Sequence, residues 1–181
     1  MLKPIKVPLV RQSHEYSCGA ASLASCLYYW GVWSGRETEL YPIIGTSRDG
    51  TRGNGIIRGA KHFGLDVVYK DRLSINDLSK LIADGYTAIL DIQAWGSYTS
   101  ETDFEKVWND GHYVVLVNVI NDQVILMDPA VPGRYTSISK SRLEERWHDW
   151  NDTGSKKEYH GAILIKGKRS IDSLSEYYEI E

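Results

Sequence analysis

Cysteine is scarce in this 181-residue sequence, which contains only Cys18 and Cys26. If both lie on one helix, a rise of about 1.5 Å per residue places their α carbons roughly 12 Å apart. A disulfide needs α carbons within about 7 Å of each other. The two thiols are therefore expected to stay free, which is typical of a protein in a reducing compartment.

The sequence also lacks an excess of charge of one sign and a long hydrophobic run. Its 21 basic and 24 acidic residues are well mixed and give a formal net charge of −3. This balance argues against nucleic acid or an anionic membrane surface as a partner. No run of about 18 apolar residues occurs, and the first ten residues lack the apolar core of a signal peptide. We therefore expect no membrane insertion and a cytoplasmic location.

Clustered metal ligands are missing as well. His62, His148 and His160 show no regular spacing with other ligand types, and a structural zinc site would need more cysteines or grouped histidines. The sequence therefore predicts no metal and no cofactor.

The hydrophobic pattern predicts helices mainly in the first half of the chain and strands mainly in the second. Helices are expected at 18–30, 55–63, 74–83 and 139–150, strands at 65–70, 86–94, 113–120, 123–128 and 159–167, and a long loop at 95–111. This order is typical of the α+β class rather than of regular βαβ units. At this length we expect a single domain, 1–181, with its core at about 6–167 and a tail or short helix at 168–181.

One cysteine lies where the sequence predicts a helix to begin. Cys18 follows Ser17, a good N-cap residue, and a helix N-terminus favours the reactive thiolate. Gly19 is small enough to let a substrate backbone approach, and Gln12 offers a side-chain amide as a donor to a developing oxyanion. Taken alone, however, a cysteine in this position is more often a small buried residue.

A nucleophilic thiol needs a base, and the base needs an acceptor that orients it. His112 begins one predicted strand, in GHYVVLV, and Asp128 ends the next, in VILMDPA. In a hairpin, both would lie at the same rim of the sheet. Each also has a simpler explanation, as a strand-end histidine and as a strand terminator before Pro129.

The register of this hairpin decides whether the two side chains share a face. With a regular two-residue turn at 121–122, Asp128 would oppose Val115 and lie on the other face from His112. A three-residue turn over 121–123 would pair Asp128 with Leu116 instead. The sequence therefore predicts a longer turn or a bulge.

These motifs together resemble the C39 peptidases and C39-like domains, a papain-fold group that includes bacteriocin leader-processing enzymes. The resemblance rests on Gln12 six residues before Cys18-Gly-Ala, then Gly-His112-Tyr-Val-Val, then Asp128-Pro129, and it spans roughly residues 6–166. It implies a papain-like fold with N-terminal helices packed on a C-terminal antiparallel sheet.

The activity implied is that of a cysteine peptidase acting on a peptide or protein. Cys18 would attack the peptide carbonyl, His112 would move the proton, Asp128 would orient His112, and Gln12 would stabilise the oxyanion. The residues expected to border the substrate are Gly19, Trp95, Gly96 and Gly111, although core packing is an equal alternative for Trp95.

Two further functions use the same residues. A thiol acyltransferase or amidase would pass the acyl group to an amine, and a C39-like peptide-binding module would keep the fold without turnover. Bacteriocin exporters carry their peptidase at the N-terminus of a transporter and often have Asp before the cysteine. Here Ser17 stands in that position, and the sequence has no membrane span or phosphate-binding loop, so a transporter partner would be a separate chain.

Overall fold

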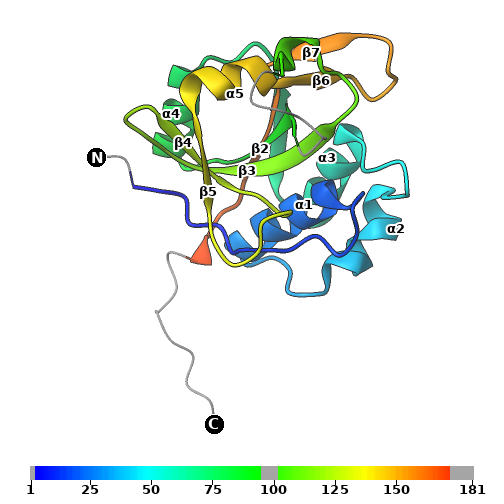
Figure 1. Cartoon of the computed structure of the whole chain (residues 1–181). Helices are drawn as coiled ribbons and strands as arrows, with labels where there is room; N and C mark the ends of the chain where they lie inside the picture. Colours follow the sequence, from blue (N-terminus) through cyan, green and yellow to red (C-terminus); the bar gives the residue numbers. More distant parts are fainter. Residues whose placement is uncertain (1–2, 95–101, 172–181) are drawn as a thin grey trace.

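The computed structural model describes residues 3–94 and 102–171, in which helices pack around a six-stranded sheet (Figure 1). The helices are α1 (Cys18–Tyr29), α2 (Tyr41–Ile44), α3 (Gly53–His62), α4 (Ile75–Ala83) and α5 (Lys140–Arg146), with 3-10 turns η1 (Glu37–Leu40) and η2 (Phe104–Lys106). The strands are β1 (Asp66–Lys70), β2 (Thr87–Gln93), β3 (Gly111–Ile120), β4 (Gln123–Met127), β5 (Thr136–Ser139), β6 (His148–Trp150), β7 (Lys157–Tyr159) and β8 (Ala162–Lys166).

The sheet is antiparallel and has the strand order β1-β8-β2-β3-β4-β5, while β6 and β7 form a separate ribbon. In the view of Figure 1, α1, α2 and α3 lie below the sheet, and α4 and α5 lie above it. The predicted α+β class, with N-terminal helices packed on a mostly C-terminal antiparallel sheet, is confirmed. The apolar runs of β2, β3 and β8 lie in the middle of the sheet, as strands buried on both faces should.

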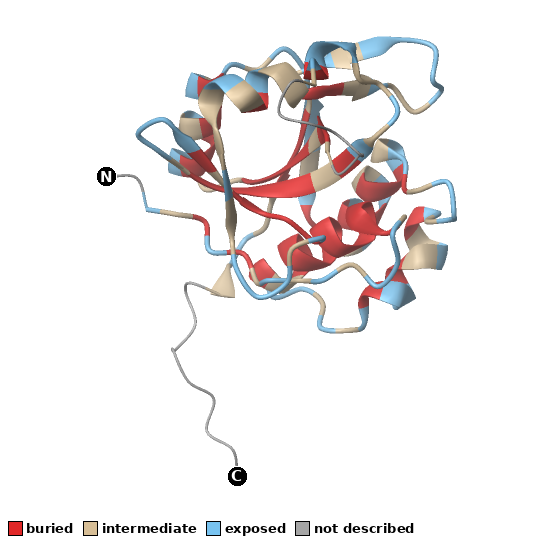
Figure 2. Cartoon of the chain, in the orientation of Figure 1, coloured by how far each residue is buried: buried red, intermediate tan, exposed pale blue. Residues whose placement is uncertain are grey.

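Helix α1 is the most buried helix of the fold and contacts β3 (Figure 2). Its small residues, such as Ala20 and Ala24, are fully buried and allow a close approach to the sheet. Ser17 is the N-cap residue, but its hydroxyl bonds the main chain of His14 instead of capping the helix. The helix ends before Gly31, whose φ of 63° suits a residue without Cβ. The predicted boundaries of this helix are confirmed, and they fix Cys18 in its first turn.

The β3–β4 hairpin combines a two-residue turn at Asn121–Asp122 with a β-bulge. The bulge leaves Val117 as an extra residue on β3. If this register continues past the end of β4, Asp128 lies opposite Val114 and not opposite Val115. Asp128 is then on the same face of the sheet as His112. The predicted bulge is confirmed, whereas the three-residue turn considered as an alternative does not form.

Two predicted elements are wrong in extent. The helix expected over 139–150 ends at Arg146, and the strand expected over 159–167 is interrupted at His160, whose φ is 54°. The cause is Trp147, which is fully buried and donates its indole N–H to the carbonyl of Gly161 at 2.7 Å. This contact of Trp147 ends the helix, and β6 begins at the next residue and pairs with β7.

Short elements were not predicted at all. Helix α2, turns η1 and η2, and strand β5 are three or four residues long, too short for a hydrophobic period to be visible. Trp95, Gly96 and the tail from residue 172 lie outside the described residues. No helix in the described part of the chain is long and apolar enough to cross a membrane.

Candidate active site

Cys18, His112 and Asp128 meet where the N-terminus of α1 lies against β3. The Nε2 atom of His112 and the Oδ1 atom of Asp128 are 2.8 Å apart, and all three residues are less than 9% exposed. His112 also forms a side-chain hydrogen bond with Cys18. Because Asp128 occupies Nε2, the other ring nitrogen, Nδ1, is the atom available to the thiol. The imidazole therefore bridges a thiol and a carboxylate.

The surroundings of Cys18 favour its thiolate. Burial raises the pKa of the thiol, but the hydrogen bond and charge interaction with His112, with hydrogen bonds from the main chain at Tyr113 and Gly19, bring the pKa below its usual value. The helix N-terminus adds a further positive potential. A lowered thiol pKa is the property expected of a reactive cysteine.

The surroundings of His112 favour the imidazolium form. Burial lowers the pKa of His112, but hydrogen bonds to Asp128 and Cys18 outweigh this effect and raise the pKa to about 9. Asp128 is itself held in place by the amide of Ala130, which donates to Oδ1 at 2.9 Å. The two pKa shifts have opposite directions, and both favour a pair of a thiolate and an imidazolium.

Gln12 lies close to the turn that follows Asp128, because its main-chain N–H donates to the carbonyl of Pro129 at 3.0 Å. Its side-chain Nε2 donates to the carbonyls of His14 and Glu15, at 2.9 and 3.1 Å. The Oε1 atom of Gln12 is buried without a hydrogen-bond partner in the described part of the chain. The amide thus braces the loop before α1, and its role as an oxyanion donor stays a prediction.

Two of the glycines expected to contact substrate have close protein neighbours. A Cβ atom on Gly19 would lie 2.7 Å from Cβ of Thr51, so α1 needs a glycine to pack against that loop. A Cβ on Gly111 would collide with the carboxylate of Asp149. Close packing accounts for both glycines, and their contact with substrate stays a prediction.

A second group of polar residues, only partly exposed to solvent, lies near Cys18 and was not predicted. Asp91 lies in the apolar strand β2, close enough to Asp149 and Tyr113 for their side chains to change its pKa. Burial first, and then the neighbouring charges of Asp149 and Cys18, raise the pKa of Asp91 well above its usual range. The available signal was the lone carboxylate in the apolar run TAILDIQ. Asp149 carried no such signal because it lies in a segment predicted as helix.

Metal binding finds no support in the part of the chain that the structure describes. Residues 3–94 and 102–171 contain no group of three or more His, Cys, Asp or Glu side chains arranged to hold a metal ion.

Comparison with known proteins gives the family of this chain. A model of the peptidase C39 family matches residues 6–151, which include Gln12, Cys18, His112 and Asp128. The chain belongs to the peptidase C39 family. An uncharacterized protein from Methanothermobacter thermautotrophicus is 33% identical over 128 residues, 71% of this chain and 75% of that protein. A second uncharacterized protein, from Methanothermobacter marburgensis, is 31% identical over 123 residues, 68% of this chain and 72% of that protein.

Solved structures of C39 domains share this fold. The peptidase domain of Streptococcus ComA, a bifunctional ABC transporter involved in quorum sensing, superposes with a TM-score of 0.64 at 22% identity. The match covers 93% of this chain and 100% of that domain. A double-glycine motif protease from an AMS/PCAT transporter, solved in complex with the leader peptide, gives a TM-score of 0.66 at 23% identity, over 91% and 94% of the two chains. These likenesses place the helices and sheet of this C39 protein in a peptidase-domain fold.

Proposed function

We propose that this C39 protein is a cysteine peptidase that hydrolyses a peptide bond with Cys18 as nucleophile, His112 as general acid and base, and Asp128 as the residue that orients His112. The observation that supports it best is the imidazole of His112, which bonds Asp128 at 2.8 Å and also hydrogen-bonds Cys18. This is the geometry of an activated nucleophile, its base and an orienting acceptor.

The first half of the reaction forms an acyl-enzyme. The thiolate of Cys18 attacks the scissile carbonyl carbon, and a tetrahedral intermediate forms with the negative charge on oxygen. His112 then gives its proton to the leaving amine as the C–N bond breaks, leaving a thioester on Cys18 and a neutral imidazole.

The second half releases the acyl group. Neutral His112 takes a proton from water, the resulting hydroxide attacks the thioester, and the C–S bond breaks to give a carboxylic acid and the thiolate. Asp128 keeps Nε2 of His112 occupied in both halves, so that the ring presents Nδ1 to the reacting groups. An amine in place of water would give acyl transfer by the same steps.

The main-chain N–H of Cys18, at the start of α1, and the side-chain amide of Gln12 would stabilise the oxyanion. Since Nε2 of Gln12 already donates to two loop carbonyls, an oxyanion would share or replace one of these acceptors. We propose that the loop holds the side-chain amide of Gln12 near the oxyanion position. This amide shifts to donate to the oxyanion when substrate binds.

The proposed substrate is a peptide or a protein with an extended segment, such as a leader sequence. The support is the double-glycine motif protease, whose structure contains a leader peptide. The two solved domains compared above both come from transporters. A separate transporter chain is therefore the proposed partner.

The test is a peptide library incubated with the wild-type protein, with Cys18→Ala and with Cys26→Ala, in the presence of a nucleophilic amine. We expect new C-terminal acids from the wild type and from Cys26→Ala, and none from Cys18→Ala. Products capped by the amine would identify an acyltransferase instead. Equal cleavage by Cys18→Ala would overturn the proposal.

A further inference from the structure

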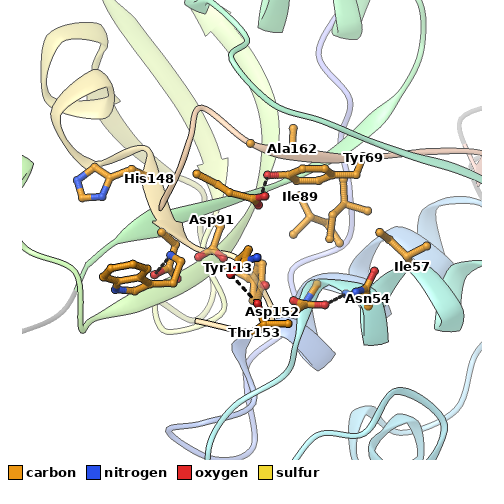
Figure 3. A pocket seen from close by; sticks show the side chains of 17 residues that line it. Asn54, Ile57, Tyr69, Ile89, Asp91, Tyr113, His148, Asp152, Thr153 and Ala162 are labelled. Atoms are coloured by element: carbon orange, nitrogen blue, oxygen red, sulfur yellow. Dashed lines mark hydrogen bonds between the residues drawn. The ribbon is translucent and has the colours of Figure 1, made fainter. Parts of the chain in front are cut away.

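A cavity of about 270 Å³ lies beside the candidate active site, between the N-terminus of α3, the middle of β2, the start of β8 and the β6–β7 ribbon (Figure 3). Its wall includes Tyr113, which connects it with the thiol. The main chain at Tyr113 hydrogen-bonds Cys18, and the ring lies 3.1 Å from a Cβ placed on Gly19. On its other side, the hydroxyl lies 3.6 Å from a Cβ placed on Gly53, a residue that lines the cavity.

The lining of this cavity is acidic. It contains four carboxyl groups, those of Asp91, Asp149, Asp152 and Glu158, and the described residues that line it include no lysine or arginine. The volume is large enough for a butyl-sized chain with a charged head group.

Three of the carboxylates already have protein partners. Asp149 accepts a hydrogen bond of 2.7 Å from the amide of Trp150. Asp152 accepts hydrogen bonds of 2.8 Å from the amides of Gly53 and Asn54 at the start of α3. Glu158 accepts one of 2.7 Å from the hydroxyl of Tyr69. These groups shape the walls and need no ligand.

Asp91 differs because one of its oxygens has no partner. Its Oδ1 atom is shielded from solvent and forms no hydrogen bond within the described part of the chain. The carboxyl group is also in contact with that of Asp149. Two neighbouring carboxyl groups repel each other unless they share a proton or a cation is bound next to them. Burying a carboxylate oxygen without a hydrogen-bond donor also costs free energy.

We infer that this cavity binds a cationic side chain of the peptide substrate, arginine or lysine, from a residue close to the scissile bond, with Asp91 as its main acceptor. The inference rests on the proposed peptidase function and names the class of substrate that the site selects. Asp91 lines the cavity, so its carboxyl group can accept from N–H donors of the incoming group, and Tyr113 and Tyr69, which also line it, contact the aliphatic part. An organic cation fits better than a metal ion, because these carboxylates are not grouped as metal ligands.

The proximity of Asp91 to the thiol links this recognition to the chemistry. Cys18 is near enough to raise the pKa of Asp91 through its charge, and both contact Tyr113. A side chain bound at Asp91 therefore brings the peptide backbone next to Cys18.

The experiment has two arms. The first arm compares peptides that contain arginine, or its neutral isostere citrulline, at each position around the cleaved bond. We expect arginine to raise kcat/KM by about 10-fold or more at one position, the effect of a charged hydrogen bond. Asp91→Asn should remove this preference. Glu105→Gln, which changes an exposed acid of the loop before β3, should retain it.

The second arm measures binding without turnover. Butylguanidinium and its neutral analogue butylurea are titrated into Cys18→Ala and into the double variant with Asp91→Asn. Butylguanidinium should bind Cys18→Ala at least about 10-fold more tightly than butylurea, and the double variant should lose this difference. If Asp91→Asn fails to fold, Asp149→Asn serves in its place.

The two proposals fail separately. Binding of butylguanidinium with no cleavage of any peptide would overturn the peptidase and leave the cationic cavity intact. Cleavage without an arginine preference, together with equal binding of butylguanidinium and butylurea, would overturn the cavity assignment and leave the peptidase intact.

Discussion

Cys18 and Cys26 lie on the same helix, yet their thiols have opposite acidities. Interactions with His112 bring the pKa of Cys18 below its usual value in spite of burial, whereas burial raises the pKa of Cys26 to about 12. Cys26 is fully buried in the core behind the site. The helix thus carries one thiol whose thiolate is favoured and one whose thiolate is disfavoured.

This difference predicts selective alkylation. At pH 7, iodoacetamide should modify Cys18 at least about 100-fold faster than Cys26, because only the thiolate reacts. Peptide mapping by mass spectrometry would measure both rates in the same sample. Equal rates, or a faster reaction at Cys26, would contradict the assignment of the nucleophile.

Asp128→Asn should narrow the pH range of activity. The raised pKa of His112 means that its imidazolium form is complete below pH 6.5 and is lost as the pH rises through about 9. Without the negative charge of Asp128, the alkaline limb of the pH profile should move down by about one unit, and kcat/KM should fall about 10-fold or more.

The matched control for this variant is Asp122→Asn, an exposed residue in the turn of the same hairpin. It should keep the wild-type profile. If the alkaline limb of the pH profile is unchanged in Asp128→Asn, Asp128 does not orient His112.

Gln12→Ala separates stabilisation of an oxyanion from support of the loop. Loss of an oxyanion donor should lower kcat about 100-fold or more, whereas alkylation of Cys18 forms no oxyanion and should change little. Gln123→Ala, at an exposed position of β4, should leave both rates unchanged. A parallel fall in cleavage and alkylation would show that Gln12 acts only through its bonds to the carbonyls of residues 14 and 15.

Gly19→Ala should destabilise the protein through a clash. The added Cβ would lie 2.7 Å from that of Thr51, so the loop or α1 must shift, at a cost of about 1–3 kcal/mol. The control is Gly53→Ala, whose Cβ would meet its nearest neighbour at 3.4 Å, an ordinary contact. Urea denaturation would compare the two, and equal stabilities would contradict the packing explanation for Gly19.

The sequence predicts the parts of this site that depend on local patterns. The spacing of apolar residues predicts α1, although Ser17 does not cap it as expected. Long apolar runs predict the strand that carries His112 and the strand that leads to Asp128. The need for a bulge followed from side-chain alternation alone, although its position at Val117 could not be predicted, because β3 is apolar on both faces there.

The rest depends on contacts between distant segments. Asp149 is carried by β6, which exists because Trp147 is anchored to Gly161, a contact with no signal in the sequence. Gly19 is predicted from the sequence to border the substrate, but its close packing against Thr51 depends on the tertiary fold. The acidic cavity is therefore a product of the tertiary fold.

The most direct test of the account is to quench a cleavage reaction in acid and map the acyl adduct by mass spectrometry. We predict a thioester to the N-terminal product on Cys18, present also in Cys26→Ala and absent from Cys18→Ala. An adduct on any other residue, or peptide cleavage that persists in Cys18→Ala, would contradict it.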